Sequence, residues 1–290
     1  MPDPFKTIAL VGKYDSPELG DALMRLADFL RQRGHDVLIA QNTADHIGNA
    51  DFPTAELGDI GTRADLAIVL GGDGTMLSIA RMLVDSGIPL VGVNQGHLGF
   101  LTDVPTESML DCIGSMLDGH YVAEERLLLS TRIMRGETEV YAACAFNDVV
   151  ISKASSGRLI EFEAHIDGDF VYGQRSDGLV IATPTGSTAY ALSAGGPILH
   201  PSLEAFVMVP ICAHTLSARP IAVNSRSRVE IQLLQAGDAR VYFDGQRHFD
   251  LQINDTVVVC RAPKAVRLLH PESYSYYQTL RQKLQWNKKL

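Results

Sequence analysis

A glycine-rich segment that carries a carboxylate stands between an apolar run and an amphipathic stretch. The apolar run is residues 66–70, and the segment after it has the sequence Gly71-Gly72-Asp73-Gly74-Thr75. Glycines let the backbone approach a ligand closely, and N–H groups at the start of a helix form a cradle for phosphate. A carboxylate inside such a cradle favours either chemistry or metal binding. The alternative is a tight strand-to-helix turn in which Asp73 caps the helix.

A second unusual segment is rich in hydroxyl groups. Residues 183–190 have the sequence Thr-Pro-Thr-Gly-Ser-Thr-Ala-Tyr, with five hydroxyl groups among eight residues. Residues 191–196 then predict a short helix that stops at a pair of glycines. Hydroxyl and N–H groups at a helix start suit the sugar hydroxyls and phosphates of a ligand. The alternative is a capped turn that binds nothing.

Several other site patterns are missing from the sequence. No P-loop is present, and the dinucleotide-binding fingerprint fails because Leu77 stands where its third glycine belongs. No GxSxG motif surrounds Ser187 or Ser193, which argues against a serine hydrolase. The four cysteines lie far apart and the nine histidines form no metal-binding pattern. The sequence therefore indicates neither a disulfide framework nor a zinc site.

The composition is typical of a globular protein. Of 290 residues, 46% are hydrophobic and 20% charged, and the net charge of −9 disfavours binding to nucleic acid. The longest strongly apolar stretch, 205–213, is too short for a membrane span, which needs about 20 residues. The N-terminus does not resemble a signal peptide. We expect a soluble, cytoplasmic protein with no membrane or nucleic-acid partner.

The first part of the chain alternates short apolar runs with helical patterns. Strands are predicted at 7–11, 36–40, 66–70 and 88–93, and helices at 19–30, 76–84 and 109–117. Gly34 stands where the first helix should be capped. Alternation of this kind predicts an α/β domain with a parallel sheet, over residues 1–120.

From about residue 121 the apolar residues recur with a period of two. The alternation is clearest at 159–166 and 228–233. It continues near 139–153, 170–183, 206–213, 239–243, 248–253, 256–261 and 265–269, between turn residues. This predicts an all-β, sandwich-like domain over residues 121–270. Residues 273–286 return to a helical pattern, within a terminal segment 271–290.

Four motifs together resemble the NAD kinase family. They are the glycine-rich segment at 71–75, Asn94-x-Gly96-x-Leu98-Gly99-Phe100-Leu101-Thr102, Phe146-Asn147-Asp148, and the hydroxyl-rich segment at 183–190. The resemblance covers essentially the whole chain and is closest to proteobacterial members. It implies transfer of the γ-phosphoryl group of ATP to the 2′-hydroxyl of the adenosine ribose of NAD, giving NADP. It also implies a terminal helix that returns to the first domain, and assembly as a homodimer or homotetramer.

The resemblance also assigns roles to individual residues. Asp73 matches the general base, with metal ligand as its alternative role, and Gly72, Gly74 and Thr75 lie beside the phosphates. A divalent cation, Mg²⁺ by expectation, accompanies ATP. The residues expected to contact the dinucleotide are Phe100, Asn147, Asp148, Arg158, Arg175, Asp177, Thr188, Ala189, Tyr190, Ala191, Leu192, Ser193 and Gln246. Without the resemblance, Gln246 simply follows a type I′ hairpin turn at Asp244-Gly245.

Two other functions stay open at this point. One is a related lipid or sugar kinase, since glycine-rich elements like the one at 71–75 occur there too. A lipid kinase would need an apolar groove or a basic face, and the acidic sequence indicates neither. The other is an NAD-binding regulatory protein without activity. Loss of Asp73 or of the glycines would favour that function, but the sequence contains both.

Overall fold

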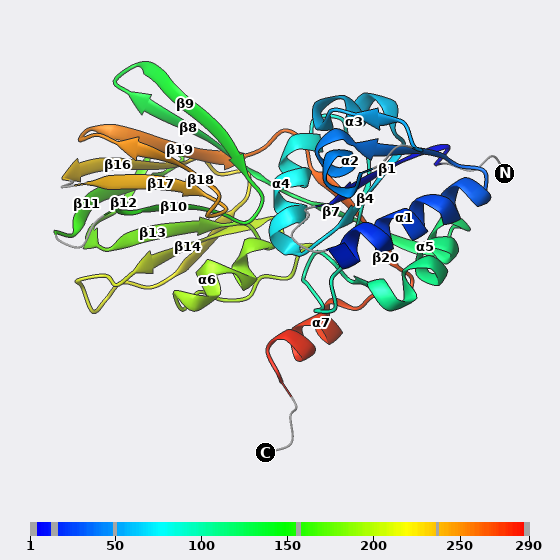
Figure 1. The fold of residues 1–290 in the computed structure, drawn as a ribbon. Helices are drawn as coiled ribbons and strands as arrows, with labels where there is room; N and C mark the ends of the chain where they lie inside the picture. Colours follow the sequence, from blue (N-terminus) through cyan, green and yellow to red (C-terminus); the bar gives the residue numbers. More distant parts are fainter. Residues whose placement is uncertain (1–4, 13–16, 49–50, 155–157, 236–237, 287–290) are drawn as a thin grey trace. The chain divides into compact units, whose positions relative to one another are not determined.

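The computed structural model describes residues 5–12, 17–48, 51–154, 158–235 and 238–286. Contacts within the chain divide it into two compact units. The first unit holds the residues up to Glu125 together with those from Val266 onward, and the second holds Arg126–Ala265. Figure 1 shows both units and labels most of their helices and strands.

The first unit is an α/β layer structure. Its elements are β1 (Thr7–Gly12), α1 (Pro17–Gln32), β2 (Asp36–Ala40), α2 (Gln41–Ile47), β3 (Thr54–Ala55), α3 (Leu57–Arg63), β4 (Leu66–Leu70), α4 (Asp73–Leu83), β5 (Leu90–Asn94), β6 (Val104–Pro105), the 3₁₀ turn η1 (Thr106–Ser108), α5 (Met109–Leu117), β7 (Tyr121–Arg126), β20 (Val266–Pro271) and α7 (Tyr276–Lys283).

The strands of this unit form one sheet in the order β3-β2-β1-β4-β5-β20-β7, with β6 beside β5. Strands β1 to β5 pair in parallel. The strand order reverses between β1 and β4, and ligands of open α/β sheets bind at the carboxyl ends of strands beside such a reversal. The loop after β4 is therefore placed where a ligand site is expected.

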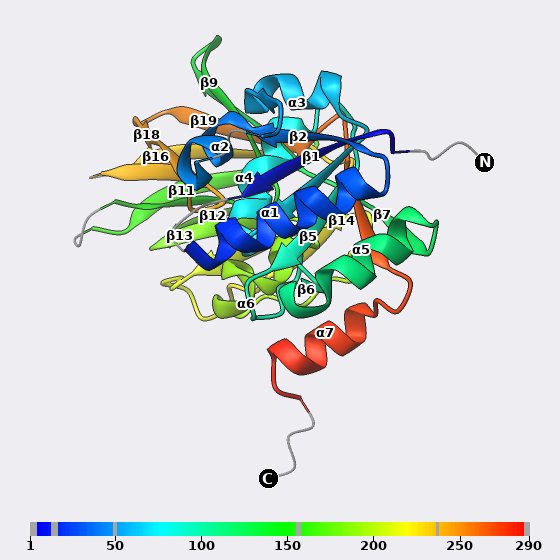
Figure 2. The ribbon, with the colours of Figure 1, turned by 45° about the vertical axis from the view of Figure 1, so that its right-hand side comes forward.

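Helices cover both faces of the sheet. Apolar residues of α1 and α5 form a buried core with alternate residues of the strands, among them Ile8, Ile68 and Val91. Figure 2 shows α1 and α5 in front of the sheet and α4 behind it. Strand β4 is buried along its whole length, as the continuous apolar run at 66–70 predicts.

One predicted segment belongs to a different sheet from the one expected. The run at 265–269, predicted as part of the β-rich domain, is β20, and it pairs in parallel with β5 through Leu268 and Leu90. Leu269 lies in the core beneath α1 and α5. Its nearly continuous apolar sequence is typical of a strand in a parallel sheet, where both faces are covered.

The second unit is a β-sandwich. Its elements are β8 (Leu129–Arg135), β9 (Thr138–Ala145), β10 (Asp148–Lys153), β11 (Ile160–Ile166), β12 (Asp169–Ser176), β13 (Gly178–Ala182), the 3₁₀ turn η2 (Gly186–Thr188), α6 (Tyr190–Ser193), β14 (Ala205–Ile211), β15 (Ile221–Asn224), β16 (Val229–Gln235), β17 (Ala239–Phe243), β18 (Arg247–Leu251) and β19 (Asp255–Arg261). They form two six-stranded antiparallel sheets, β15-β14-β13-β10-β17-β18 and β12-β11-β16-β19-β8-β9.

The period-two pattern places one face of each sheet in a shared core. Ile160, Phe162 and Ala164 of β11 are buried there against strands of the other sheet, including Ile181 and Phe243. The first of the two sheets is covered on its other face as well, where α6 packs. The structure confirms the predicted fold class, an α/β part with a mostly parallel sheet and an all-β part with antiparallel sheets. Within the described ranges, no helix has the length and apolar character that crossing a membrane requires.

Candidate functional site

Asp73 is the first residue of α4, directly after the turn that leaves β4. Gly72 is the N-cap residue of that helix, so no side chain caps the helix N-terminus. Gly71 has φ of +158° and is packed against the side chain of Thr75, so a larger residue would collide there. Gly72 and Gly74 are exposed, and they present the positive end of α4 to solvent. The turn can therefore accept an anion.

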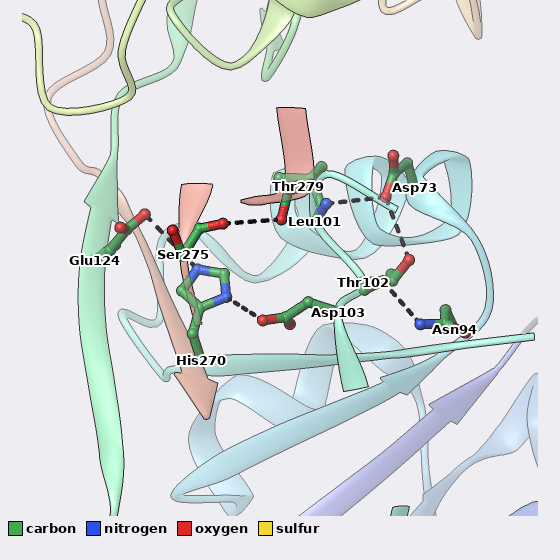
Figure 3. Close-up of polar contacts among 9 residues, drawn as sticks. All are labelled: Asp73, Asn94, Leu101, Thr102, Asp103, Glu124, His270, Ser275 and Thr279. Carbon is green, nitrogen blue, oxygen red and sulfur yellow. Dashed lines mark hydrogen bonds and ion pairs between the residues drawn. The ribbon is translucent and has the colours of Figure 1, made fainter. Parts of the chain in front are cut away.

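The Asp73 carboxylate binds a second loop and does not cap its own helix. Its Oδ2 accepts a hydrogen bond from the Phe100 N–H at 2.9 Å, and its Oδ1 accepts from the Leu101 N–H at 3.0 Å. The Thr102 hydroxyl donates to Oδ1 at 3.3 Å (Figure 3). The alternative that Asp73 is a capping residue is therefore wrong. Its carboxylate is fixed by groups 27 to 29 residues away.

The loop that holds Asp73 leaves the carboxyl end of β5, the parallel neighbour of β4. Asn94 ties this loop together, because its amide donates to the Thr102 carbonyl at 3.3 Å and its side-chain oxygen accepts from the Gly96 N–H. A methyl group on Gly99 would collide with the Asp73 carboxylate and the Thr102 hydroxyl. The glycine permits the close approach that orients the carboxylate.

The hydroxyl-rich segment, residues 183–190, uses most of its hydroxyl groups internally. Thr183 donates to the Phe146 carbonyl at 2.7 Å, and Ser187 donates to the Pro184 carbonyl at 2.6 Å and accepts from the Leu199 N–H at 2.9 Å. Thr188 donates to the Thr185 carbonyl. These are the internal hydrogen bonds of a capped turn. Tyr190, in contrast, is 46% exposed.

A pocket of about 380 Å³ lies beside this segment in the second unit. Four residues predicted to contact a ligand line it, namely Asn147, Asp148, Ala189 and Tyr190. The sequence analysis predicted no ligand contact for the other lining residues, which are Val150, Ser152, Tyr242, Asp244 and Gly245. Tyrosine rings and buried polar groups at one pocket are suited to a planar ring and sugar hydroxyls.

Asp244 organises one wall of this pocket. Its carboxylate accepts three backbone hydrogen bonds, from the N–H groups of Phe146 at 3.0 Å, Asn147 at 2.7 Å and Asp148 at 3.1 Å. Asp244 and Gly245 both have positive φ, and the Gln246 N–H bonds the Phe243 carbonyl, which confirms the predicted hairpin turn. The turn therefore positions the bend that carries Asn147 and Asp148.

Asp148 is the most perturbed carboxyl group of the pocket. It is 4% exposed, and burial, followed by the nearby charge of Asp244, raises its pKa from 3.8 to about 7. Burial disfavours the charged form, and a second carboxylate disfavours it further. Strongly perturbed carboxyl groups in pockets are typical of functional sites.

The raised pKa gives a prediction for stability. Between pH 4 and 7 the folded protein holds the Asp148 proton that the unfolded chain releases, so the free energy of unfolding falls as pH rises. The slope from this group is at most about 1.4 kcal/mol per pH unit. Urea unfolding at pH 5 and pH 8 should show a larger loss for the wild type than for Asp148→Asn. Equal losses in the two proteins would contradict the assigned direction.

Comparison with known proteins shows which family has this sequence and fold. Residues 8–121 match the ATP-NAD kinase N-terminal domain and residues 146–271 match the ATP-NAD kinase C-terminal domain. The chain is 61% identical over 290 residues to the NAD kinase of Thiobacillus denitrificans, covering all of both chains. The chain belongs to the ATP-NAD kinase family. It is also 54% identical to the NAD kinase of Aromatoleum aromaticum, over 98% of this chain and 95% of that one.

Solved structures of similar fold come from the same family. The crystal structure of yeast NADH kinase complexed with NADH has a TM-score of 0.91 at 25% identity, covering 100% of this chain and 90% of that chain. The NAD kinase from Archaeoglobus fulgidus in complex with ATP has a TM-score of 0.77 at 24% identity, covering 96% and 98%. The predicted resemblance is confirmed. ATP-NAD kinases phosphorylate NAD to NADP, so this chain is a phosphotransferase.

The other residues predicted to contact ligands in an ATP-NAD kinase lie outside the pocket lining. Arg175 on β12 is paired with Glu161 at 3.9 Å and has a side chain 61% exposed. Asp177 forms an ion pair with Lys153 at 2.6 Å. Arg158 and Gln246 are exposed, and Phe100 is half-buried beside Asp73. Ala191, a residue of α6 within the predicted contact segment, has a fully buried side chain.

The sequence analysis missed residues that order the loop around Asp73 in the first unit and the pocket of the second unit. Asp244 was seen only as a turn residue, and Thr102 only as part of a motif. Asp103, next in the chain, forms a buried pair with His270 at 3.0 Å. A polar residue inside an apolar stretch, as His270 is within 266–271, was the available signal for this pair.

Proposed function

We propose that this protein transfers the γ-phosphoryl group of ATP to the 2′-hydroxyl of the adenosine ribose of NAD, with Asp73 as the general base. The observation that carries the proposal is the Asp73 carboxylate, fixed by three hydrogen bonds at the N-terminus of α4. A secondary hydroxyl is a weak nucleophile. A positioned carboxylate that removes its proton contributes about 10²–10⁴-fold to the rate.

The proposed reaction is a direct displacement of ADP at the γ-phosphorus. The ribose 2′-oxygen forms a bond to the γ-phosphorus of ATP, and the bond from that phosphorus to the bridging oxygen breaks, releasing ADP. The proton of the 2′-hydroxyl passes to Asp73. The exposed glycine backbone and the positive end of α4 stabilise negative charge on the phosphates.

NAD is assigned to the pocket of the second unit. Asn147 and Asp148 are proposed to bond ribose and nicotinamide-side groups, since both line the pocket and the Asn147 side-chain oxygen is buried with no protein partner among the described residues. Tyr190, exposed at the rim, offers a ring face to a base. The remaining residues of the second unit that are predicted to contact the dinucleotide, from Arg158 to Gln246, are proposed to do so as well.

A divalent cation fits the proposal as a companion of ATP. No group of three metal-binding side chains occurs in the part of the chain that the structure describes. Mg²⁺ is usually held by one or two carboxylates together with substrate phosphates, and the half-buried Asp73 carboxylate is suited to that role. When bound, the cation would neutralise charge on the transferring phosphoryl group.

The function is tested by incubating the protein with NAD, Mg²⁺ and ATP and measuring NADP with an NADP-specific dehydrogenase. A parallel reaction with polyphosphate in place of ATP identifies the donor. We expect NADP to form with ATP. Tight NAD binding without NADP formation from either donor would favour the regulatory alternative.

Arg175 is expected to influence the choice between NAD and NADH. The similar yeast enzyme is an NADH kinase, and the oxidised nicotinamide ring carries a charge that the reduced ring lacks. Because the guanidinium and the oxidised ring are both cations, direct attraction cannot explain a preference for NAD, and we propose that Arg175 acts on the shape of the pocket, which its pair with Glu161 fixes. We expect Arg175→Gly to reduce the preference for NAD by about tenfold, or 1.4 kcal/mol, in kcat/KM. Arg175→Lys is the control that keeps the charge, and an unchanged preference in Arg175→Gly would refute this role.

The protein is proposed to form a homodimer or homotetramer. Edge strands expose unpaired backbone groups and need cover, and the two sheets of the second unit end at β15, β18, β12 and β9. Phe170 and Val171, on edge strand β12, are exposed apolar residues. Light scattering should give a multiple of the 31.6 kDa chain mass. A particle of that single mass at all working concentrations would contradict this.

A further inference from the structure

His270 is buried at the end of β20 between two carboxylates. It is 1% exposed, and its Nδ1 lies 3.0 Å from Asp103 Oδ2 (Figure 3). Its Nε2 lies 3.7 Å from Glu124 Oε2 on β7. The ring stacks on Tyr274, with centroids 4.0 Å apart and planes at 11°. Because a carboxylate accepts, Nδ1 donates this hydrogen bond, and the bond and the stacking together hold the ring.

Asp103 connects this histidine to the loop that orients Asp73. It directly follows Leu101 and Thr102, whose N–H and hydroxyl groups hold the Asp73 carboxylate. On its other side it precedes β6, where Val104 pairs with Val93 of β5. The backbone from 100 to 103 is therefore anchored at Asp73 by one end and at His270 by the other.

The terminal segment contacts this loop at further points. Leu98 and Asp103 line a small cavity of about 150 Å³ together with Ser275, Gln278 and Thr279 of the α7 region. Lys283 Nζ lies 5.9 Å from the centroid of the Phe100 ring. The α7 region therefore packs against the loop, and His270 adds a buried polar contact to it through Asp103.

Packing alone does not require a histidine and an aspartate here. Burying polar groups costs free energy, and an apolar pair of similar volume often stabilises a protein as well or better. A hydrogen-bonded pair does fix geometry. We propose that His270 is a positioning residue for phosphoryl transfer, which acts through Asp103 on the 100–103 backbone and so on the orientation of Asp73. The proposal rests on the role of Asp73 proposed above.

Three variants of His270 separate geometry from packing. His270→Leu keeps bulk and removes both nitrogens. His270→Asn places its amide nitrogen as many bonds from Cα as Nδ1 and keeps a donor toward Asp103, whereas a glutamine reaches one bond farther. The matched control is His35→Leu, because His35 is also buried in the first unit, with Nδ1 2.9 Å from the Phe5 carbonyl.

Hydrogen exchange of the Phe100 and Leu101 amides measures, without any substrate, how firmly His270 holds the loop that binds Asp73. Both amides donate to Asp73. His270→Leu should speed their exchange by about tenfold or more, the equivalent of 1.4 kcal/mol of lost protection. His35→Leu should leave these two amides unchanged even if it lowers the melting temperature equally. Unchanged exchange in a folded His270→Leu protein would overturn the proposal.

Kinetics then test the consequence for the reaction. A misplacement of about 1 Å costs on the order of 10²-fold in rate, so His270→Leu should lower kcat by about 10- to 100-fold. The KM for NAD should change less than about twofold, because uniform binding is untouched. His270→Asn should restore most of kcat, and His270→Gln less. If asparagine restores nothing while the melting temperature recovers, the proposal fails.

A double variant isolates the path through Asp73. On the Asp73→Asn background, His270→Leu should change the remaining kcat by less than about twofold, because coupled groups are not additive. A full 10- to 100-fold further loss would overturn the proposal. If Asp73→Asn alone keeps wild-type kcat, the proposed base is wrong and this inference falls with it. If Asp73→Asn is inactive and His270→Leu has wild-type kcat, only this inference falls.

Discussion

Replacement of Asp73 by asparagine is expected to lower kcat by about 10²–10⁴-fold, the usual contribution of a positioned acid or base. The amide nitrogen cannot accept the ribose proton. The structure adds a second consequence, because both carboxylate oxygens accept hydrogen bonds from loop 100–102. An amide nitrogen would face an N–H donor, at a cost of about 1–3 kcal/mol in stability. Steady-state kinetics and urea unfolding measure the two effects.

Asp65→Asn is the control for the loss of a carboxylate charge that accepts a backbone hydrogen bond. Its Oδ2 accepts the Thr7 N–H at 2.8 Å in the same unit, at the other end of the strands. This variant should lose stability and keep kcat. A titration with Mg²⁺ then separates the two roles of Asp73, since loss of a metal ligand raises the Mg²⁺ requirement and loss of a base does not. Near wild-type kcat in Asp73→Asn would exclude both roles and direct attention to Asp148 and Asp177.

Gly186→Ala is expected to weaken NAD binding by about 10- to 100-fold, because displaced pocket residues would lose hydrogen bonds to the ligand, at a cost of about 1–3 kcal/mol. A methyl group on Gly186 would overlap the backbone of Asn147, including its Cα at 2.7 Å. Backbone cannot move aside as a flexible side chain does. Asn147 and Asp148 should therefore shift within the pocket. Calorimetric titration with NAD gives the dissociation constant.

Gly173→Ala is the control in the same unit. Its nearest neighbour would be the flexible Glu163 side chain at 3.8 Å, an ordinary contact. Its NAD affinity and stability should stay close to wild type. If Gly186→Ala folds and binds NAD as tightly as Gly173→Ala does, the pocket beside Asn147 is not the NAD site.

Secondary structure was predictable wherever buried residues give the sequence a clear apolar pattern. The run at 66–70 and the alternation at 159–166 both appear as strands. Helix α3 was missed because it contains two glycines and buries only Ile60, so its sequence has no apolar stripe. Strand β20 was recognised as a strand but given the wrong sheet, since a periodic pattern does not identify the partner strand.

The site was predictable only where chemistry shows in local sequence. The glycine-rich segment and the hydroxyl-rich segment are unusual in composition, and both stand at strand ends. Their partners are distant in the chain. Asp244 binds backbone groups 96 to 98 residues away, and His270 pairs with Asp103 across 167 residues. Such contacts arise from the fold, and a single sequence does not show which residues are paired.

Transfer of isotopically labelled phosphate from ATP to NAD tests the proposed reaction most directly. The protein is incubated with NAD, Mg²⁺ and ATP labelled in the γ-phosphoryl group, and the dinucleotide product is examined by phosphorus–proton correlation NMR. We predict one labelled phosphate per product molecule, coupled to the 2′ proton of the adenosine ribose, with an equal amount of ADP. Label on any other hydroxyl, or an unlabelled dinucleotide after ATP has been consumed, would contradict the assigned function.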